Sequence, residues 1–228
     1  MVKLMLVDDY PAYRQGLAEL LNRKYGEFTD TRAFVISEIG SNIDILKAVA
    51  ELRPDIVLLD YQMQHKGALE TTEIICREFP GIKVIILSFS DLEEDFFRAI
   101  RAGASAYLLK NSTFRNLAES IHTVATGNTA ISAPMLNKLI EEFRRNVKES
   151  GKDLCALSQR EMEILSLAAR GQSNKKIAES CFISETTVKA HFRSILSKME
   201  VRNRAGAVAI ATARGFIKRE MLLEQAGV

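Results

Sequence analysis

The sequence predicts a doubly wound α/β domain, with five parallel strands and helices on both faces, followed by a small all-helical domain. Short apolar runs alternate with amphipathic helical stretches through about the first 130 residues, which is typical of a doubly wound sheet. From residue 157 onward, apolar residues recur at helical spacing and no strand-like run remains.

The five predicted strands are short, continuous apolar runs, as expected for strands buried on both faces of a parallel sheet. Four of them run directly into residues that carry chemistry, namely Asp8 with Asp9, Asp60, Ser88 and Lys110. The carboxyl ends of strands in a doubly wound sheet share one crevice, so we expect these side chains to lie together. The strands are residues 3–7, 34–36, 56–59, 84–87 and 106–109.

The stretches between these strands predict helices that end at helix-stopping residues. Pro54, Pro80, Gly103 and Gly127 stand where four of the five should end. Residues 23–33 are expected to form a somewhat long surface loop. The expected helices cover residues 11–22, 42–52, 69–79, 92–102 and 114–126.

We divide the chain into a first domain over residues 1–131, a linker over 132–153 and a second domain over 154–228. The linker should contain one helix, which is either a solvated spacer or a dimerisation helix. In the second domain, Ser158 and Glu161 have the spacing of a capping box. A short helix, a tight turn and a longer helix then follow, which is the order of a helix-turn-helix.

The longer helix of this pair has two distinct faces. Its exposed face should carry Thr186, Lys189, Ala190, Arg193 and Ser197. Its buried face should carry Val188, Phe192, Ile195, Leu196 and Met199.

Composition excludes several classes of protein. No apolar stretch approaches the roughly 18 residues needed to span a bilayer, and we see no secretion signal. Cys76, Cys155 and Cys181 are far apart without metal or redox spacing, so we expect free thiols in the cytoplasm. Residues 152–228 hold 13 Lys and Arg against 8 Asp and Glu, whereas residues 1–151 hold 18 against 21. This basic second part favours nucleic acid as its partner.

Asp60 is the candidate nucleophile of the expected crevice, because a carboxylate can accept a phosphoryl group as an acyl phosphate. Crowded acids need a cation, and Mg²⁺ suits carboxylates, a backbone carbonyl and waters. We expect Asp9 and Asp60 to bind Mg²⁺ directly, Asp8 to act through water, and the Gln62 carbonyl to be a third protein ligand. Lys110 would pair with the phosphoryl oxygens, and Ser88 would donate a hydrogen bond to them.

These residues stand in stretches that resemble the receiver domain of two-component response regulators. The stretches are LMLVDDYPAYRQGLAELL, RPDIVLLDYQM, VIILS and GASAYLLKNS, and the resemblance covers about residues 2–129. It implies a flavodoxin-like sheet, with Asp60 as phosphoacceptor, Asp8 and Asp9 as the acidic pocket, and Ser88, Tyr107 and Lys110 as switch residues. It also implies Mg²⁺ and a sensor histidine kinase as the phosphoryl donor. On phosphorylation Tyr107 would rotate inward.

The chain departs from the receiver pattern just after Asp60. The family usually has Met-Pro there, whereas Met63 is followed by Gln64, and Gly67 comes about one residue early. Tyr61 is also bulky for its position. The loop beside the phosphoacceptor is therefore expected to have an altered shape.

The stretch from Leu157 to Ala211 resembles the LuxR-type (GerE-like) helix-turn-helix, and a receiver before it is the layout of the NarL/FixJ subfamily. The resemblance implies base-edge contacts from Lys189, Ala190 and Arg193. One such module buries too little surface for tight DNA binding, so we expect dimers on paired DNA half-sites. The dimer contact is expected through the helix over residues 205–214. Most of the apolar residues of that helix are expected to pack in the core of the domain. The implied phosphate contacts are Lys175, Thr187, Lys198, Arg202 and Asn203.

Three functions remain open at this point. The first is a DNA-binding transcription regulator switched by phosphorylation of Asp60, which is not an enzyme. The second keeps DNA binding but makes the receiver an unphosphorylated protein-interaction module. The third is a haloacid-dehalogenase-like phosphatase, which is disfavoured because that class places its nucleophile after the first strand.

Overall fold

The computed structural model describes residues 1–40, 44–63, 67–131, 133–147 and 157–217. The chain divides into two compact units, residues 1–125 and 126–228. The boundary therefore lies six residues before the expected end of the first domain, because the segment that follows packs within the second unit.

The first unit is built on one sheet of five parallel strands in the order β2-β1-β3-β4-β5. The two central strands, β3 and β4, are almost wholly buried because helices cover both of their faces. The prediction of a doubly wound parallel sheet is therefore confirmed. The strands are β1 (Val2–Val7), β2 (Ala33–Ile39), β3 (Ile56–Asp60), β4 (Lys83–Ser88) and β5 (Ala106–Leu109).

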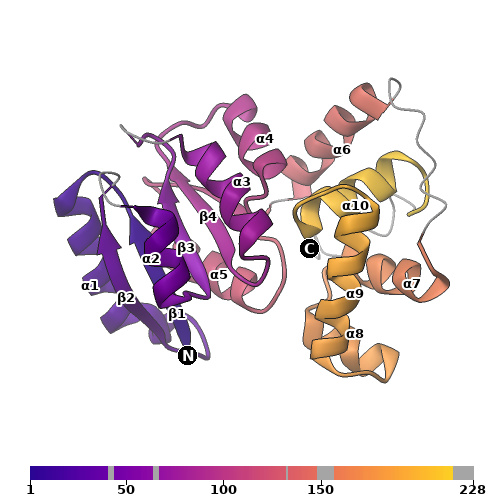
Figure 1. Cartoon of the computed structure of the whole chain (residues 1–228), viewed down its shortest axis with the longest axis horizontal. Helices are drawn as coiled ribbons and strands as arrows, with labels where there is room; N and C mark the ends of the chain where they lie inside the picture. Colours follow the sequence, from indigo (N-terminus) through magenta and orange to yellow (C-terminus); the bar gives the residue numbers. More distant parts are fainter. Residues whose placement is uncertain (41–43, 64–66, 132, 148–156, 218–228) are drawn as a thin grey trace. The chain divides into compact units, whose positions relative to one another are not determined.

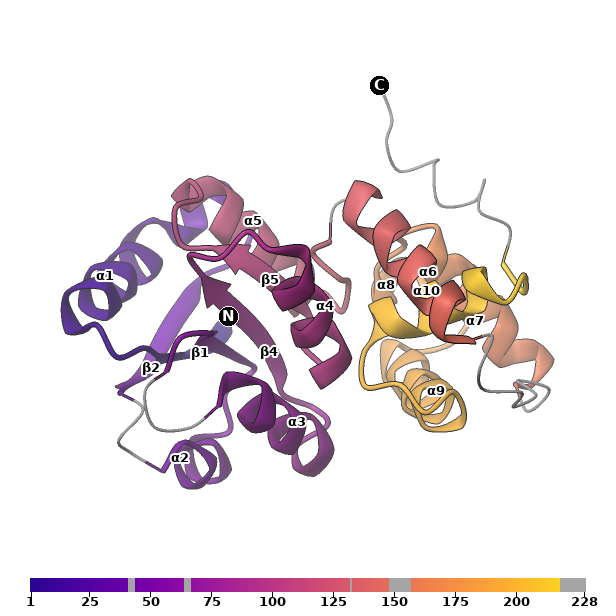
Figure 2. The same ribbon diagram turned by 90° about the horizontal axis from the view of Figure 1, so that it is seen from above.

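Five helices cover this sheet, with α1 and α5 on one face and α2 and α3 on the other (Figures 1 and 2). Asp44 caps α2 by accepting a hydrogen bond from the Lys47 amide, and Gly103 ends α4 at a φ of 114° that favours glycine. The helices are α1 (Pro11–Phe28), α2 (Ile45–Leu52), α3 (Ala68–Glu78), α4 (Glu93–Ala102) and α5 (Phe114–Ala125). The predicted first turn of α2, at residues 42–43, lies outside the described residues.

Helix α1 is longer than the sequence predicts. We expected it to end at residue 22 and a loop to follow, but the helix continues to Phe28. The buried stripe of Leu17, Leu21 and Tyr25 explains the difference, because Tyr25 adds a further helical repeat and is fully buried.

The second unit is all helical. The capping box of Ser158 and Glu161 is present at the start of α7, as predicted. Helices α8 and α9 form the predicted helix-turn-helix (Figure 1). The helices are α6 (Ala133–Val147), α7 (Gln159–Ala169), α8 (Asn174–Cys181), α9 (Glu185–Lys198) and α10 (Arg204–Ala213).

Helix α10 is the core of this unit and packs against α6, α7 and α9. Leu139 and Ile140 of α6 are fully buried, so α6 is part of a packed unit and not a solvated spacer. Every residue from Ala205 to Thr212 is buried. Helix α6 covers α10 in this single chain, and the expected dimer contact through α10 stays a prediction.

A buried arginine joins the segments of the second unit. The Arg204 guanidinium donates hydrogen bonds to the carbonyls of Gly127 (3.2 Å), Ala168 (3.1 Å) and Gln172 (2.7 Å). Burial lowers the pKa of Arg204 to about 10, which still leaves it charged at neutral pH. Gly127 has a φ of 87°, and a Cβ there would meet the Asn174 side chain at 2.1 Å, so the position requires glycine.

Two of the three cysteines, Cys76 and Cys181, are free, and Cys155 lies outside the described residues. Among the described helices, none is both long and apolar enough to cross a membrane.

Candidate functional site

The predicted crevice brings two of its acids and the lysine together. Asp8 follows β1, Asp60 ends β3 and Lys110 follows β5, so the parallel strands deliver all three to one edge of the sheet. The Lys110 Nζ lies 2.7 Å from Asp8 Oδ2 and 2.9 Å from Asp60 Oδ1. The side chains are 1% (Lys110), 5% (Asp8) and 1% (Asp60) exposed, so this ion-paired cluster is almost fully buried.

The two carboxylate oxygens of Asp60 differ in their hydrogen bonding. Its Oδ1 accepts from Lys110 and, at 3.2 Å, from the Gln62 amide. Its Oδ2 is buried and has no hydrogen-bond partner among the described residues. Burial raises the pKa of Asp60 and the Asp8 charge adds to this, against the lowering effect of Lys110 and the Gln62 amide. A buried carboxylate oxygen without a partner is costly, which favours a ligand at this position.

The other two predicted magnesium ligands do not complete a cluster of acids. Asp9 is half-buried beside Asp8, and Gln62 has an exposed side chain and bonds to Asp60 through its backbone amide. Within the described residues no group of three or more His, Cys, Asp or Glu side chains is gathered in a metal-binding arrangement. Lys110 instead pairs with both Asp8 and Asp60 and offsets one of their two negative charges. Gln64, where the chain departs from the receiver pattern, lies outside the described residues.

Ser88 and Tyr107 are connected through the backbone of Ser90. The fully buried Ser88 hydroxyl oxygen accepts a hydrogen bond from the Ser90 amide at 2.9 Å. The Tyr107 hydroxyl donates to the Ser90 carbonyl at 2.8 Å. Burial raises the pKa of Tyr107, and a side-chain hydrogen bond from Ser88 acts against this, so the two residues are also in direct contact.

Tyr61 completes this network, which sequence reasoning missed. Its hydroxyl donates to Asp95 Oδ1 at 2.7 Å, and the Ser90 hydroxyl donates to Asp95 Oδ2 at 2.6 Å. These bonds, led by that from Ser90, lower the pKa of Asp95. The rings of Tyr61 and Phe96 pack edge-on against Tyr107, with centroids 6.0 and 6.2 Å away. Tyr107 is half-buried in this position, and its inward rotation on phosphorylation stays a prediction.

The helix-turn-helix presents the predicted faces of α9. All five residues expected on the exposed face are exposed, and four of the five expected on the buried face are buried, with Leu196 half-buried. Ser184 caps α9 by accepting from the Thr187 amide at 3.0 Å, and Phe182 takes a left-handed conformation in the turn. The exposed face of α9, including Lys189, Ala190 and Arg193, is therefore open to a ligand.

Some of the predicted phosphate contacts have partners within the unit. Asn203 is buried, and its side chain caps α10 by accepting from the Gly206 amide at 2.7 Å. The Lys198 Nζ pairs with Glu161 Oε2 at 2.7 Å, and the Thr187 hydroxyl lies 2.8 Å from that of Ser184. Lys175 and Arg202 are exposed. We therefore remove Asn203 from the interface, because its side chain is occupied and shielded.

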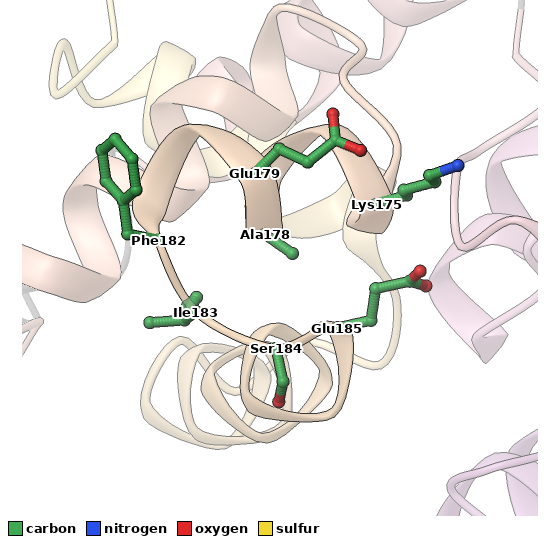
Figure 3. A pocket seen from close by; sticks show the side chains of 7 residues that line it. All are labelled: Lys175, Ala178, Glu179, Phe182, Ile183, Ser184 and Glu185. Carbon is green, nitrogen blue, oxygen red and sulfur yellow. The ribbon is translucent and has the colours of Figure 1, made fainter.

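A shallow hollow of about 560 Å³ lies between α8 and the start of α9 (Figure 3). Phe182, which is 95% exposed, stands at one end, and Lys175 and Glu185 stand at the other. Two of its seven lining residues are acidic and one is basic, so the hollow itself is not suited to a phosphate backbone. Its lining residues are Lys175, Ala178, Glu179, Phe182, Ile183, Ser184 and Glu185.

Comparisons with known proteins agree with this architecture. Residues 4–122 match the response regulator receiver domain, and residues 155–211 match the bacterial regulatory proteins of the luxR family. The chain is 35% identical over 212 residues to the transcriptional regulatory protein LiaR of Bacillus subtilis (strain 168). The aligned region covers 92% of this chain and 97% of that protein.

Solved structures show the same fold. A LuxR-family two-component response regulator from Aurantimonas sp. SI85-9A1 matches with a TM-score of 0.55 and 26% identity, over 63% of this chain and 98% of that one. RcsB of Salmonella enterica serovar Typhimurium, bound to promoter rprA in the presence of the phosphomimetic BeF3−, has a TM-score of 0.51 and 18% identity, over 92% of this chain and 97% of that one.

The chain belongs to the response regulators that join a receiver domain to a luxR-family DNA-binding domain. Its relatives are transcriptional regulators of two-component systems, so the chain is a regulator and not an enzyme.

Proposed function

We propose that this regulator accepts a phosphoryl group on Asp60 from a sensor histidine kinase and reads DNA with the exposed face of α9. The observation that carries the proposal is the buried cluster in which Lys110 pairs with Asp8 and Asp60 while Asp60 Oδ2 has no described partner. A buried nucleophile beside a fixed cation is what phosphoryl transfer requires, since the reaction depends on positioning and charge stabilisation.

In the transfer step, an Asp60 oxygen attacks the phosphorus of the donor's phosphohistidine. The new O–P bond forms as the P–N bond breaks, and the histidine nitrogen takes the bonding electron pair. Lys110 then pairs with the phosphoryl oxygens as a point charge. The Ser88 hydroxyl would donate to the same oxygens in place of its hydrogen bond to Tyr107.

The donor set suits Mg²⁺, because carboxylates and a carbonyl are oxygen ligands that this ion prefers. Asp9, Asp60 and the Gln62 carbonyl would hold the ion, with Asp8 acting through water. Its charge would neutralise the phosphoryl oxygens and the acids during transfer. The unpartnered Asp60 oxygen supports this assignment.

For DNA reading, Lys189, Ala190 and Arg193 would reach base edges in the major groove, since α9 is the second helix of the helix-turn-helix. Lys175, Thr187 and Arg202 would contact phosphates, and Lys198 would do so only by sharing its ion pair with Glu161. A homodimer on paired half-sites would bury enough surface for specific binding. A protein with these partners would work in the cytoplasm.

Labelling with acetyl phosphate and Mg²⁺ tests the phosphoacceptor. The native chain should take up one phosphoryl group, whereas Asp60→Asn, which keeps the shape of the side chain, should take up none. DNA affinity and oligomeric state should then change when beryllofluoride is added to the native chain and not to the variant. An unlabelled native chain would instead favour a receiver that acts only as a protein-interaction module.

A further inference from the structure

Aromatic rings surround the ammonium of Lys110 on the sides that its two carboxylates leave open. The Nζ lies 4.8 Å from the ring centroid of Tyr13, 5.3 Å from that of Phe89 and 5.7 Å from that of Tyr10. A cation within about 6 Å of a ring face is attracted to it. Tyr10 and Tyr13 stand at the start of α1 and Phe89 follows β4, so rings from two separate segments converge on the cation that pairs with Asp60.

Two of these rings are exposed to solvent beside the buried cluster. Tyr10 is 59% exposed and Phe89 is 58% exposed, whereas the Lys110 and Asp60 side chains are each 1% exposed. The cluster stands at the carboxyl edge of the sheet, where the chain leaves the strands. Exposed rings thus stand beside charged groups that are themselves hidden from solvent.

We propose that Tyr10, Tyr13 and Phe89 form an aromatic cover that shields the acyl phosphate on Asp60 from water and so lengthens its lifetime. This inference rests on the proposed phosphorylation of Asp60. It assigns to three residues of this chain the control of how long the regulator stays switched on.

The chemistry of hydrolysis explains why a cover has this effect. A water oxygen attacks the phosphorus on the side opposite the Asp60 oxygen, in line with the bond that breaks. A new O–P bond forms, the Asp60 carboxylate takes back the electron pair, and inorganic phosphate leaves after the water loses a proton to solvent. Asp60 is the last residue of β3, and the exposed rings of Tyr10 and Phe89 lie near the Lys110 ammonium that pairs with it, so the proposal places them on the path of the attacking water. Excluding water from a site protects reactive intermediates from hydrolysis.

Hydrolysis of the acyl phosphate in the full-length chain tests the cover. Each protein is labelled with radioactive acetyl phosphate and Mg²⁺, the donor is removed by rapid desalting, and the loss of label is followed. Phe89→Ala and Tyr10→Ala should each lose the label about threefold faster than the native chain or more, because water gains access. Phe89→Leu, which keeps apolar bulk over the site, should stay near the native rate.

Phe34→Ala is the matched control. Phe34 is also an exposed aromatic residue, at 52%, but it pairs with Lys3 at the opposite end of the sheet from Asp8. The Phe34→Ala variant should therefore lose its phosphoryl label at the native rate. Equal rates in the native chain, Phe89→Ala and Tyr10→Ala would overturn the cover, and so would an equally fast loss in Phe34→Ala. A native chain that takes up no label would overturn the proposed function itself.

Discussion

Glu161 joins two helices of the DNA-binding unit through one carboxylate. It accepts hydrogen bonds from the Ser158 amide at 2.7 Å, the Ser194 hydroxyl at 2.6 Å and the Lys198 ammonium at 2.7 Å. Burial raises the pKa of Glu161, but these hydrogen bonds outweigh burial and bring the pKa down to about 2. The charged form is therefore strongly favoured in the folded protein.

This lowered pKa predicts a loss of stability in acid. The contribution of Glu161 is complete above its ordinary pKa of 4.5 and disappears as the pH falls toward about 2. At pH 7 Glu161→Gln should lower the free energy of unfolding by up to about 3 kcal/mol, because a pKa unit corresponds to about 1.4 kcal/mol. Urea unfolding followed by circular dichroism checks this. The gap between the native chain and the variant should narrow at pH 3, and a gap independent of pH would contradict the assignment.

At the scale of single residues, the sequence located site residues where each one ends a strand. Asp8, Asp60 and Lys110 were predictable for that reason, because parallel strands fix which ends meet. The bond from Tyr61 to Asp95 was not, since these residues are 34 positions apart and meet only through packing of α4. Asn203 was misassigned because asparagine both caps helices and contacts phosphates, and only its burial distinguishes the two roles.

Among the elements, α4 depends on a residue of the phosphoacceptor loop. Asp95 lies in its first turn and is held by Tyr61 from one side and Ser90 from the other. Ser90 in turn contacts both Ser88 and Tyr107. A change at Ser88 therefore has a direct path of hydrogen bonds, through Ser90, to the start of α4.

Removing the Tyr61 hydroxyl should loosen the start of α4. Tyr61→Phe keeps the ring that packs on Tyr107 but removes the hydrogen bond to Asp95, which is worth about 1 kcal/mol. Hydrogen–deuterium exchange of the amides from residue 90 to residue 97 should become several-fold faster, with α2 unchanged as an internal control. Unchanged exchange at residues 90–97 would show that the hydroxyl does not hold α4.

The lengths and partners of elements were harder to predict than their existence. Arg23 to Phe28 contains Gly26, which disfavours helix, yet the fully buried Tyr25 keeps this segment in α1. The amphipathic pattern of α6 showed that one face would be buried but could not identify α10 as its partner. Both misses concern tertiary packing, which acts between segments distant in sequence.

For the molecule as a whole, DNA binding should separate into contacts that specify sequence and contacts that give affinity. Lys189→Ala on the exposed face of α9 should relax the sequence preference, since a good base contact contributes roughly 1–3 kcal/mol of discrimination. Arg202→Ala should instead weaken binding to all sequences alike and reduce the slope of log affinity against log salt by about 0.9. Fluorescence anisotropy with specific and scrambled duplexes over a salt series distinguishes them. Identical behaviour of both variants would contradict the proposed orientation of α9.

The binding site of the Arg204 guanidinium, formed by the carbonyls of Gly127, Ala168 and Gln172, has a consequence for the exchange of domains between regulators. Its guanidinium takes one of its carbonyl partners from Gly127, 77 positions earlier, and α10 is covered by α6. A hybrid protein that keeps this chain from residue 126 onward retains all three carbonyl partners of Arg204. A hybrid joined near residue 154 transplants the DNA-reading helices but leaves one arginine partner and the cover of α10 behind. The transferable unit therefore begins well before the helix-turn-helix family match at residue 155.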